Sequence, residues 1–453
     1  MRRLRLIVPF AALVLVAAAC SNDNNGGGGG TTTGGGATTG GGTTTGALPN
    51  TGTVDVLNAM EPEEATAIQQ LVDENLVNAD YAVQIEASAD FEQQFQIRAQ
   101  GGNLDVALLP QPGTVAAEAA AGDLTSLESM GFDIDQLNQT FGEYFMSLGE
   151  YNGQHYGLPT NINLKSMIWY PKDDFDKAGY AVPQTWDELL ALSDQIVADG
   201  STPWCVGFES GGATGWPATD WMEDIMLRTA GPDVYDQWVN HEIPFNDPAV
   251  VHAGQLFGDI MFHPDYVLGG AENTPSVNFG DAPGPMFKEP PGCWLHRQAS
   301  FINAFFPADA VAGTDYDWFP FPTIDDPNQQ AALFAGELAV VGTAGNRPEV
   351  KDFLSQFIDV PIQCAMGGVT ASSRISPNIN VGPDCYANSI LADASQILTA
   401  ALASGNGRFD ASDMMPAAVG SGSFWTGMVK YMQQGPDSLD GVLADIESSW
   451  PAS

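Results

Sequence analysis

Apolar residues follow two different spacings along the chain from residue 51 onwards. Short continuous or alternating apolar runs predict strands, and apolar positions three or four residues apart predict helices. By this criterion strands are expected at residues 53–57, 81–85 and 104–109, and helices at 62–76 and 91–99. Strands that alternate with helices are typical of a largely parallel sheet with both faces covered, so an α/β fold is predicted.

Three loops of this first region follow the predicted strands. They cover residues 58–61, 88–91 and 110–113. In open parallel sheets ligands bind beyond the carboxyl ends of the strands. Glu61, Asp90 and Gln111 lie on these loops and are therefore candidate ligand-binding residues. The alternative is that they are solvated loop residues without a ligand, as polar loop residues often are.

A second region starts near residue 156. A strand is predicted at residues 166–170, and Thr185 with Glu188 three residues later has the capping-box pattern of a helix start. A strand at 333–341, a helix at 348–358 and a helical tail from residue 388 follow. A body of about 400 residues exceeds one comfortable hydrophobic core, so two lobes are expected.

The first 46 residues have a different pattern. Arg2, Arg3 and Arg5 precede an apolar run at residues 6–19, which ends at Cys20 and a Gly, Thr and Asn-rich segment. The run is typical of a secretory signal and is too short for a membrane span, which needs about 20 apolar residues. The arrangement resembles a bacterial lipoprotein, which implies a signal at 1–19 and a lipidated Cys20 with a flexible tether at 20–50.

One feature of the signal departs from the lipoprotein pattern. Lipoprotein signals usually have Leu or Val three residues before the cysteine, where this chain has Ala17. An ordinary secretory signal followed by a chance cysteine is the alternative. Either way, export from the cytoplasm is expected.

The composition is strongly acidic, with 56 Asp and Glu against 15 Lys and Arg and a formal net charge of −41. Such a chain has no basic stripe for nucleic acid and would be repelled by phosphates and anionic lipid. Nucleic acid is therefore not expected as a partner. Attachment to a bilayer would have to come from the lipid on Cys20.

The chain has four cysteines besides Cys20, namely Cys205, Cys293, Cys364 and Cys385. An even number in an exported chain favours disulfides, with three possible pairings. We prefer Cys364–Cys385, which closes a short loop rich in Gly, Ser, Pro and Asn, and then Cys205–Cys293 by elimination. No metal site is expected, because the cysteines are too far apart for a zinc knuckle and the five histidines lack ligand spacing.

Three groups of segments carry a resemblance to a known family. They are YNGQHYGLP at 151–159 with WYPKD at 169–173 and PQTWDEL at 183–189; CW at 293–294 with YDWFPFP at 316–322; and MP at 415–416 with FWTGM at 424–428 and the helix at 439–446. In this order and spacing the chain resembles the extracellular solute-binding proteins of carbohydrate ABC transporters, the family of maltose-binding protein. Within this family, the sequence of these segments most resembles that of α-glucoside-binding proteins.

This resemblance implies a periplasmic-binding-protein-like fold of type II, with two hinge-linked α/β lobes and a ligand cleft between them. It implies a first lobe at 51–158 plus 325–365 and a second at 159–324 plus 366–453. The implied protein is a monomer and a receptor rather than an enzyme. It needs no cofactor, captures a sugar outside the cell membrane and delivers it to the permease of an ABC importer.

A sugar cleft needs aromatic platforms for the ring faces and polar side chains for the hydroxyl groups. The Gly-rich segment 211–221 offers Trp216, Asp220 and Trp221. Both tryptophans could instead be lobe core, as most Trp residues are. A Gly-rich loop rarely buries its aromatics deeply, which favours Trp216 as a platform.

Further ligand-binding candidates lie in three other places. Trp294 and Arg297 follow the rigid Pro-rich segment 290–293, and Phe424 and Trp425 follow a Gly-Ser segment. Asn161 and Asn163 lie where the chain is expected to cross from the first lobe to the second. Arg297 can donate two hydrogen bonds to neighbouring hydroxyls, or can pair with one of the many acids. By resemblance Trp425 stacks on sugar, while Phe424 has helix core as its alternative.

Two other functions fit parts of the sequence. A polyamine or other cation receptor would use the negative charge and a Trp–Asp cage. A secreted glycoside hydrolase would need two facing carboxylates about 5–9.5 Å apart, which sequence alone does not reveal. The chain has no Gly-x-Ser-x-Gly, His-Glu-x-x-His or phosphate-loop motif.

Overall fold

The computed structural model describes residues 52–77, 79–325 and 331–451. The predicted signal, Cys20 and most of the tether lie outside the described residues. Within the described ranges, no helix combines the length and the apolar character that crossing a bilayer requires. The described residues all belong to one compact unit of the chain.

A six-stranded sheet lies at the centre of the first hydrophobic core. Its strands are β1 (Thr53–Asn58), β2 (Ala82–Ala87), β3 (Val106–Leu109), β6 (Gly157–Leu164), β10 (Ala332–Val341) and β11 (Gly407–Phe409). Strand β1 pairs in parallel with β2 on one side and β3 on the other. Strand β10 runs antiparallel to β3 and β6 and parallel to β11. The predicted strands at 53–57, 81–85, 104–109 and 333–341 are therefore confirmed to within a few residues.

Eight α-helices contribute buried residues to this first core in the described part of the chain. They are α1 (Pro62–Asn75), α2 (Phe91–Gln100), α3 (Val115–Ala121), α4 (Ile134–Phe141), α5 (Glu143–Ser147), α11 (Pro348–Phe357), α12 (Val360–Gly367) and α13 (Ser389–Ser404). Helix α1 shows why the sequence folds in this way. Pro62 occupies its first turn, Glu63 and Glu64 follow, and the buried stripe includes Ile68 and Val72.

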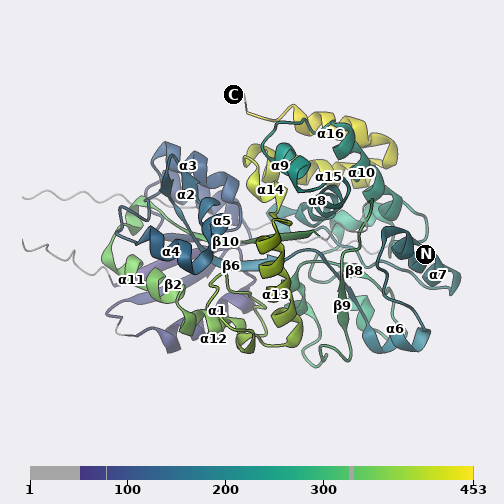
Figure 1. The fold of residues 1–453 in the computed structure, drawn as a ribbon, viewed down its shortest axis with the longest axis horizontal. Helices are drawn as coiled ribbons and strands as arrows, with labels where there is room; N and C mark the ends of the chain where they lie inside the picture. The colour runs from purple at the N-terminus through teal and green to yellow at the C-terminus, as the bar shows by residue number, and fades with distance from the viewer. Residues whose placement is uncertain (1–51, 78, 326–330, 452–453) are drawn as a thin grey trace, which may run out of the picture. The chain divides into compact units, whose positions relative to one another are not determined.

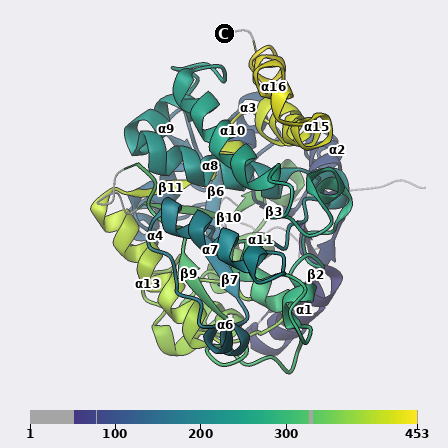
Figure 2. The same cartoon turned by 90° about the vertical axis from the view of Figure 1, so that its right-hand side faces the viewer.

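A second core is formed mainly by helices. They are α6 (Lys172–Ala178), α7 (Trp186–Ala198), α8 (Trp216–Ala230), α9 (Pro232–Val239), α10 (Pro248–Met261), α14 (Ala411–Met414), α15 (Trp425–Gln434) and α16 (Leu439–Glu447). Helices α8, α10, α15 and α16 lie together in both orientations (Figure 1, Figure 2). Helix α7 begins with the predicted capping box, in which the Thr185 side chain accepts from the Glu188 N–H.

Two small sheets complete the secondary structure. Strands β4 (Glu150–Tyr151) and β5 (Gln154–His155) form a hairpin. Strand β7 (Met167–Tyr170) pairs antiparallel with β8 (His296–Arg297) and β9 (Asp317–Pro320). Only Lys165 and Ser166 separate β6 of the large sheet from β7 of the small one. The chain therefore passes from one sheet to the other at these two residues.

The structure contains the two disulfides preferred from the sequence, Cys205–Cys293 and Cys364–Cys385. The lobe boundaries expected from the sequence stay a prediction. Of the residues that this prediction places in the second lobe, Ile375, Leu391 and Leu398 pack in the first core.

Candidate ligand-binding site

A cavity of about 480 Å³ opens at the carboxyl ends of the parallel strands. Glu61 lies on its wall after β1, Ser88 after β2 and Gln111 after β3. These strands run in the same direction, so the loops that follow them meet at one edge of the sheet. The three loops predicted to face a ligand therefore do line one cavity.

Other walls of the cavity come from elements of the second core. Trp216 is the first residue of α8, Trp425 is the first residue of α15, and Ser412 and Asp413 lie on α14. Strands β6 and β10 contribute side chains such as Asn163 and Glu337. The cavity thus lies between segments of the two cores.

One wall is aromatic. The ring centroids of Trp216 and Phe279 are 5.3 Å apart, those of Trp216 and Phe301 5.9 Å, and those of Phe279 and Phe305 5.2 Å. All four residues line the cavity. These edge-to-face and tilted contacts pack the four rings against one another. The wall is therefore a preformed apolar surface.

A glycine lets the two tryptophan-bearing helices meet. Gly215 precedes α8 with φ of 114°, a value that favours glycine, and an added Cβ would lie 2.3 Å from the Trp425 carbonyl oxygen. The Nε1 of Trp425 donates to Ser412 Oγ at 3.1 Å. Backbone contact and this hydrogen bond together place Trp425 next to the start of α8, which begins at Trp216.

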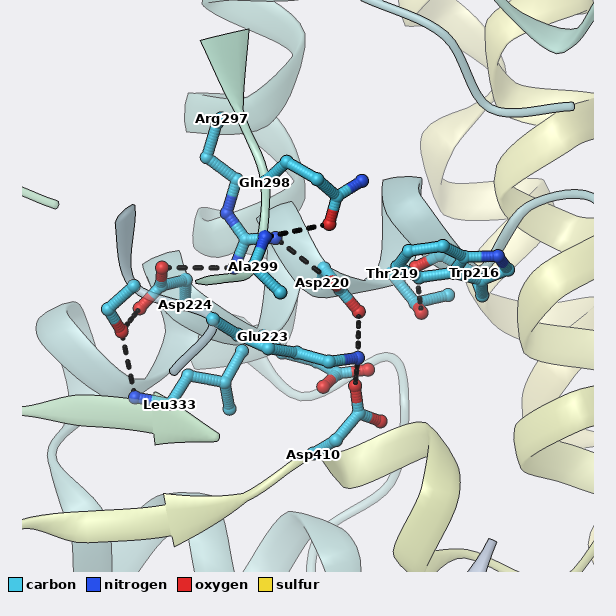
Figure 3. Close-up of polar contacts among 12 residues, drawn as sticks. Trp216, Thr219, Asp220, Glu223, Asp224, Arg297, Gln298, Ala299, Leu333 and Asp410 are labelled. Atoms are coloured by element: carbon cyan, nitrogen blue, oxygen red, sulfur yellow. Dashed lines mark hydrogen bonds and ion pairs between the residues drawn. The ribbon is translucent and has the colours of Figure 1, made fainter. Parts of the chain in front are cut away.

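A buried ionic network extends beneath the cavity from Lys165 and Asp410, which lie on the cavity wall. Figure 3 shows its polar contacts. The Lys165 ammonium donates to Asp220 at 2.8 Å and to Asp410 at 2.6 Å, and all three side chains are at most 6% exposed. It also lies 5.1 Å from the centroid of the Trp216 ring. Burial alone would lower the pKa of Lys165, but Asp220 and Asp410 outweigh it and raise that pKa.

The network continues away from the cavity. Arg297 donates to Asp220 at 3.1 Å and to Asp224 at 3.0 Å. Ser166 donates to Asp224 at 2.8 Å and accepts from the backbone N–H of Leu333 at 2.8 Å. These bonds join β8, α8, the β6–β7 crossover and β10 (Figure 3). The ionic network therefore fixes the segments that carry the cavity walls.

The network also holds the short helix α14. The Glu223 carboxylate accepts from the backbone N–H groups of Ala411 and Ser412 at 2.9 and 3.1 Å. Asp410 accepts from the Asp413 N–H and the Ser412 hydroxyl, both at 2.8 Å. These bonds orient Ser412, which in turn holds Trp425.

Three of these acids, Asp220, Glu223 and Asp410, have oxygens close enough together to resemble a metal-ligand set. Their bonding in this structure does not fit a metal, because the Lys165 ammonium already lies against Asp220 and Asp410. Glu223 is occupied by two backbone N–H groups. The cluster is therefore explained as an internal ion-pair network.

The polar part of the cavity is dominated by hydrogen-bond acceptors. Glu92, Glu337 and Asp413 place carboxyl groups on its wall. Asn161 is 5% exposed, and its Oδ1 has no hydrogen-bond partner among the described residues. Acceptors in a partly apolar cavity favour a ligand that brings its own donors, such as hydroxyl groups.

Six of the residues predicted from sequence line this cavity. They are Trp216, Trp425, Asn161, Asn163, Glu61 and Gln111. Gln111 also donates to Glu92 at 3.4 Å, and Asn163 lies 3.5 Å from the Ser300 hydroxyl. The structure thus brings together, in one place, residues that are far apart in the sequence.

Three of the predicted polar residues lie off the cavity wall, and two of them are ion-pair partners of one another. Asp220 and Arg297 have fully buried side chains and bind each other and the rest of the network. Neither lies on the cavity wall. Asp90 also lies off the wall, as the residue that precedes α2.

Three of the predicted aromatic residues also lie away from the cavity. Trp221 packs edge-on against Trp204 at 5.0 Å, and Phe424 packs against Phe245 at 5.0 Å, both within the second core. Trp294 donates to the Ser201 hydroxyl at 2.8 Å and packs in the same core. None of the three lines the cavity.

Several cavity residues were missed by sequence reasoning. The most important are Lys165, Asp413 and Ser412, together with Glu64 and Glu337. A lysine between two strand patterns at residues 164–167 was a usable signal in a chain with so few cations. The carboxylates carried no signal, because acids are abundant throughout the chain.

Sequence comparison places the chain among binding proteins. Residues 61–357 match the family described as bacterial extracellular solute-binding protein. The chain is 41% identical over 397 residues to the alpha-glucosides-binding periplasmic protein AglE of Rhizobium meliloti (strain 1021), covering 83% of this chain and 84% of that protein. It is 38% identical over 400 residues to the osmoprotective compounds-binding protein GgtB of Synechocystis sp., covering 88% and 92%.

Solved structures share the fold. The solute receptor AcbH matches with a TM-score of 0.73 at 19% identity, over 88% of this chain and 98% of that one. Maltose-bound MalE3 of T. maritima matches with a TM-score of 0.68 at 15% identity, over 87% and 98%. The structural neighbours are two-lobed binding proteins of type II, so the fold class predicted from the sequence is confirmed.

Proposed function

The chain belongs to the family of bacterial extracellular solute-binding proteins, and we propose that its solute is a sugar, most specifically an α-glucoside. Members of the family and the similar proteins are binding proteins of ABC transporters rather than enzymes. The chain is accordingly a sugar- or solute-binding receptor. The α-glucoside specificity and the mode of membrane attachment are the proposed parts.

The observation that carries the sugar proposal is the composition of the cavity wall. Trp216 and Trp425 begin two helices at the same cavity, next to acceptors such as Asn161 and Asp413. A sugar ring has flat C–H faces that pack on an aromatic ring, and its hydroxyl groups donate to carboxylate and amide oxygens. A volume of about 480 Å³ is in the usual range for a site that encloses a small ligand.

The relatives support the choice of an α-glucoside. AglE is named for α-glucosides, and GgtB is named for osmoprotective compounds. Since both relatives align with most of this chain at about 40% identity, their ligands are the first to test.

The mechanism that we propose is capture by closure. Cavity residues come from both cores, while β6 leads directly through Lys165 and Ser166 into β7. A sugar that contacts both sets of residues would stabilise a closed arrangement relative to an open one. The closed receptor would then deliver the sugar to the permease of an ABC importer.

We also propose that the receptor is a lipoprotein on the extracytoplasmic face of the cell membrane. The apolar run at 6–19, Cys20 and the Gly-rich segment up to residue 46 support this. A lipid anchor on Cys20 would keep the receptor near its permease. Mass spectrometry of the mature N-terminus tests the proposal, since an unmodified N-terminus would contradict it.

A cationic solute is the second candidate, and the acidic cavity lining favours it. Glu61, Glu92 and Asp413 face the cavity in addition to Asp410, which is paired with Lys165. Carboxylates and a tryptophan face can surround an ammonium group. The same carboxylates can instead accept from sugar hydroxyls, so the choice between the two candidates is experimental.

A thermal-shift screen against maltose, trehalose, sucrose, glucose and putrescine tests the proposal. A ligand at about 100 times its Kd stabilises the folded state by about 2.7 kcal/mol, which is readily detected. We expect one or more of the α-glucosides to raise the Tm, and product analysis to recover the sugar unchanged. A shift with putrescine alone would replace the sugar proposal, and hydrolysis of the sugar would contradict a pure binding role.

A further inference from the structure

The loop closed by the Cys364–Cys385 disulfide lies against the cavity strand. It connects α12 to α13, and we call residues 364–385 the disulfide loop. The backbone N–H of Ile162 on β6 donates to the carbonyl oxygen of Ile375 in this loop at 2.9 Å. Ile162 stands between Asn161 and Asn163, both of which line the cavity. The disulfide loop therefore pairs directly with a cavity-lining strand.

The disulfide loop is held at two further points. At its start, Gln363 donates to the Thr160 carbonyl at 3.3 Å and accepts from the Ser376 hydroxyl at 2.6 Å. Ser373 donates to the Oδ1 of Asn303, which lies in the 3-10 helix Ser300–Phe305. That short helix carries two residues of the aromatic wall, Phe301 and Phe305. The loop thus contacts both the polar and the aromatic sides of the site.

Arg374 of the disulfide loop links two carboxylates of the cavity. Its guanidinium donates to Glu64 at 3.1 Å and to Glu337. Glu64 lies on α1 and Glu337 on β10, and both line the cavity. The Arg374 side chain is only 3% exposed, whereas those of Glu64 and Glu337 are 19% and 16% exposed. The arginine is therefore behind the wall, with the two carboxylates in front of it.

We propose that the disulfide loop is part of the sugar site and that Arg374 is a positioning residue that holds Glu64 and Glu337 as paired acceptors for neighbouring sugar hydroxyls. This inference rests on the proposed function for the identity of the ligand. Its physical basis is that two carboxylates this close would repel each other without a shared cation. A bidentate guanidinium also fixes their orientation, which an ammonium group could not do as well.

The groups around Glu64 indicate how the site should respond to pH. Arg374 and Glu337 face Glu64 directly. The same cavity is lined by four further charged or titratable residues, namely Glu61, Glu92, Lys165 and Asp413. Burial and the neighbouring Glu337 raise the pKa of Glu64, Arg374 lowers it, and together they leave that pKa at about 7. Ionised Glu64 is the better acceptor, so sugar affinity should rise as the pH increases through about 7.

The experiment compares the purified wild-type chain with Arg374→Met, Arg374→Lys and Glu64→Gln. Arg347→Met is the matched control, because Arg347 pairs with Asp105 at 2.5 and 2.6 Å and neither residue lines the cavity. The first readout is an NMR titration of the glutamate carboxyl carbons without sugar, with Glu64→Gln providing the assignment. The second is calorimetric affinity for maltose, trehalose and sucrose between pH 5.5 and 9.

In Arg374→Met we expect the Glu64 titration to move upward by about 1–3 pH units, because an opposite charge has been removed. The pH dependence of sugar affinity should move upward by the same amount. At pH 7 the ionised fraction of Glu64 would fall from about half to a tenth or less, so the affinity should drop roughly five-fold or more. Arg374→Lys should recover part of this loss, and Arg347→Met should leave both readouts unchanged.

The two readouts separate the two proposals. An unchanged Glu64 titration in Arg374→Met would overturn the positioning role, whether or not any sugar binds. A shifted titration with unchanged sugar affinity and pH profile would also overturn it, because the carboxylates would then not serve the ligand. If the wild-type chain bound none of the three sugars, the α-glucoside proposal would fail, while the titration would still decide how Arg374 acts on Glu64.

Discussion

Replacing Lys165 with methionine tests whether the ionic network beneath the cavity holds the structure together. The change removes the ammonium that bonds to Asp220 at 2.8 Å and to Asp410 at 2.6 Å. The two carboxylates stay at most 1% exposed, so water cannot easily take its place. Asp220 keeps Arg297 as a partner at 3.1 Å, whereas Asp410 keeps only uncharged donors.

The expected cost is large. Removing one partner of a buried ion pair typically destabilises a protein by about 3–5 kcal/mol, because it leaves an uncompensated charge. Protonation of a carboxylate can relieve part of this cost. Burial already raises the pKa of Asp220, and loss of the Lys165 charge would raise it further. The folded variant then binds more protons than the unfolded chain, so its stability should fall as the pH rises from 5 to 8.

Urea denaturation of the wild type and Lys165→Met at pH 5 and pH 8 measures both effects. The control is Lys172→Met, which removes a surface ion pair with Asp176 at 3.0 Å and should cost less than about 1 kcal/mol. Adding Asp410→Asn to Lys165→Met should recover part of the lost stability, because the unpaired charge is gone. Equal losses in the two lysine variants, or no pH dependence in Lys165→Met, would refute the reasoning.

Three further outcomes are expected. Trp425→Ala should weaken α-glucoside binding by about tenfold or more, because an aromatic platform for the sugar is lost. The control Trp294→Phe changes a ring outside the cavity and should leave the affinity unchanged. Unchanged affinity in a folded Trp425→Ala chain would remove this ring from the site. Burial lowers the pKa of His296 to about 4, so this residue should contribute a loss of roughly 3 kcal/mol, measured as the difference between wild type and His296→Gln, as the pH decreases from 6.5 to 4. This acid-side loss should be absent from His296→Gln in urea melts, and an identical pH slope would count against it. Replacing Cys364 and Cys385, 21 residues apart, with serine should cost about 3 kcal/mol of unfolding free energy, and a loss below about 1 kcal/mol would contradict the chain-entropy argument.

The sequence predicted local elements and the edge of the sheet that faces the ligand. Thr185 and Glu188 do form a capping box, and Pro62 does begin a helix. Glu61 and Gln111 line the cavity because parallel strands bring the loops after them to one edge, a rule that needs no tertiary detail. These predictions depend on spacing alone, which is why they could be made in advance.

The direction of individual side chains could not be predicted in the same way. Trp216 and Trp221 are five residues apart on α8, which places them about 140° apart around the helix. One therefore faces the cavity while the other packs against Trp204 in the core. Adjacent residues differ by about 100°, which separates Trp425 in the cavity from Phe424 in the core in the same manner.

Asp220 and Arg297 show a second limit of sequence reasoning. An acid and an arginine near tryptophans suit a sugar site and an internal ion pair equally well. The choice depends on Lys165 and Asp410, which come from distant parts of the chain and bind the same cluster. Only the fold brings these four residues together.

A crystal structure of the chain with the α-glucoside that gives the largest thermal shift tests the central claim most directly. We expect density for the sugar in the cavity, with a ring face against Trp216 or Trp425 and hydroxyl groups within hydrogen-bond distance of Glu64, Glu337 or Asp413. Sugar bound elsewhere on the protein, or an empty cavity at saturating sugar, would contradict it.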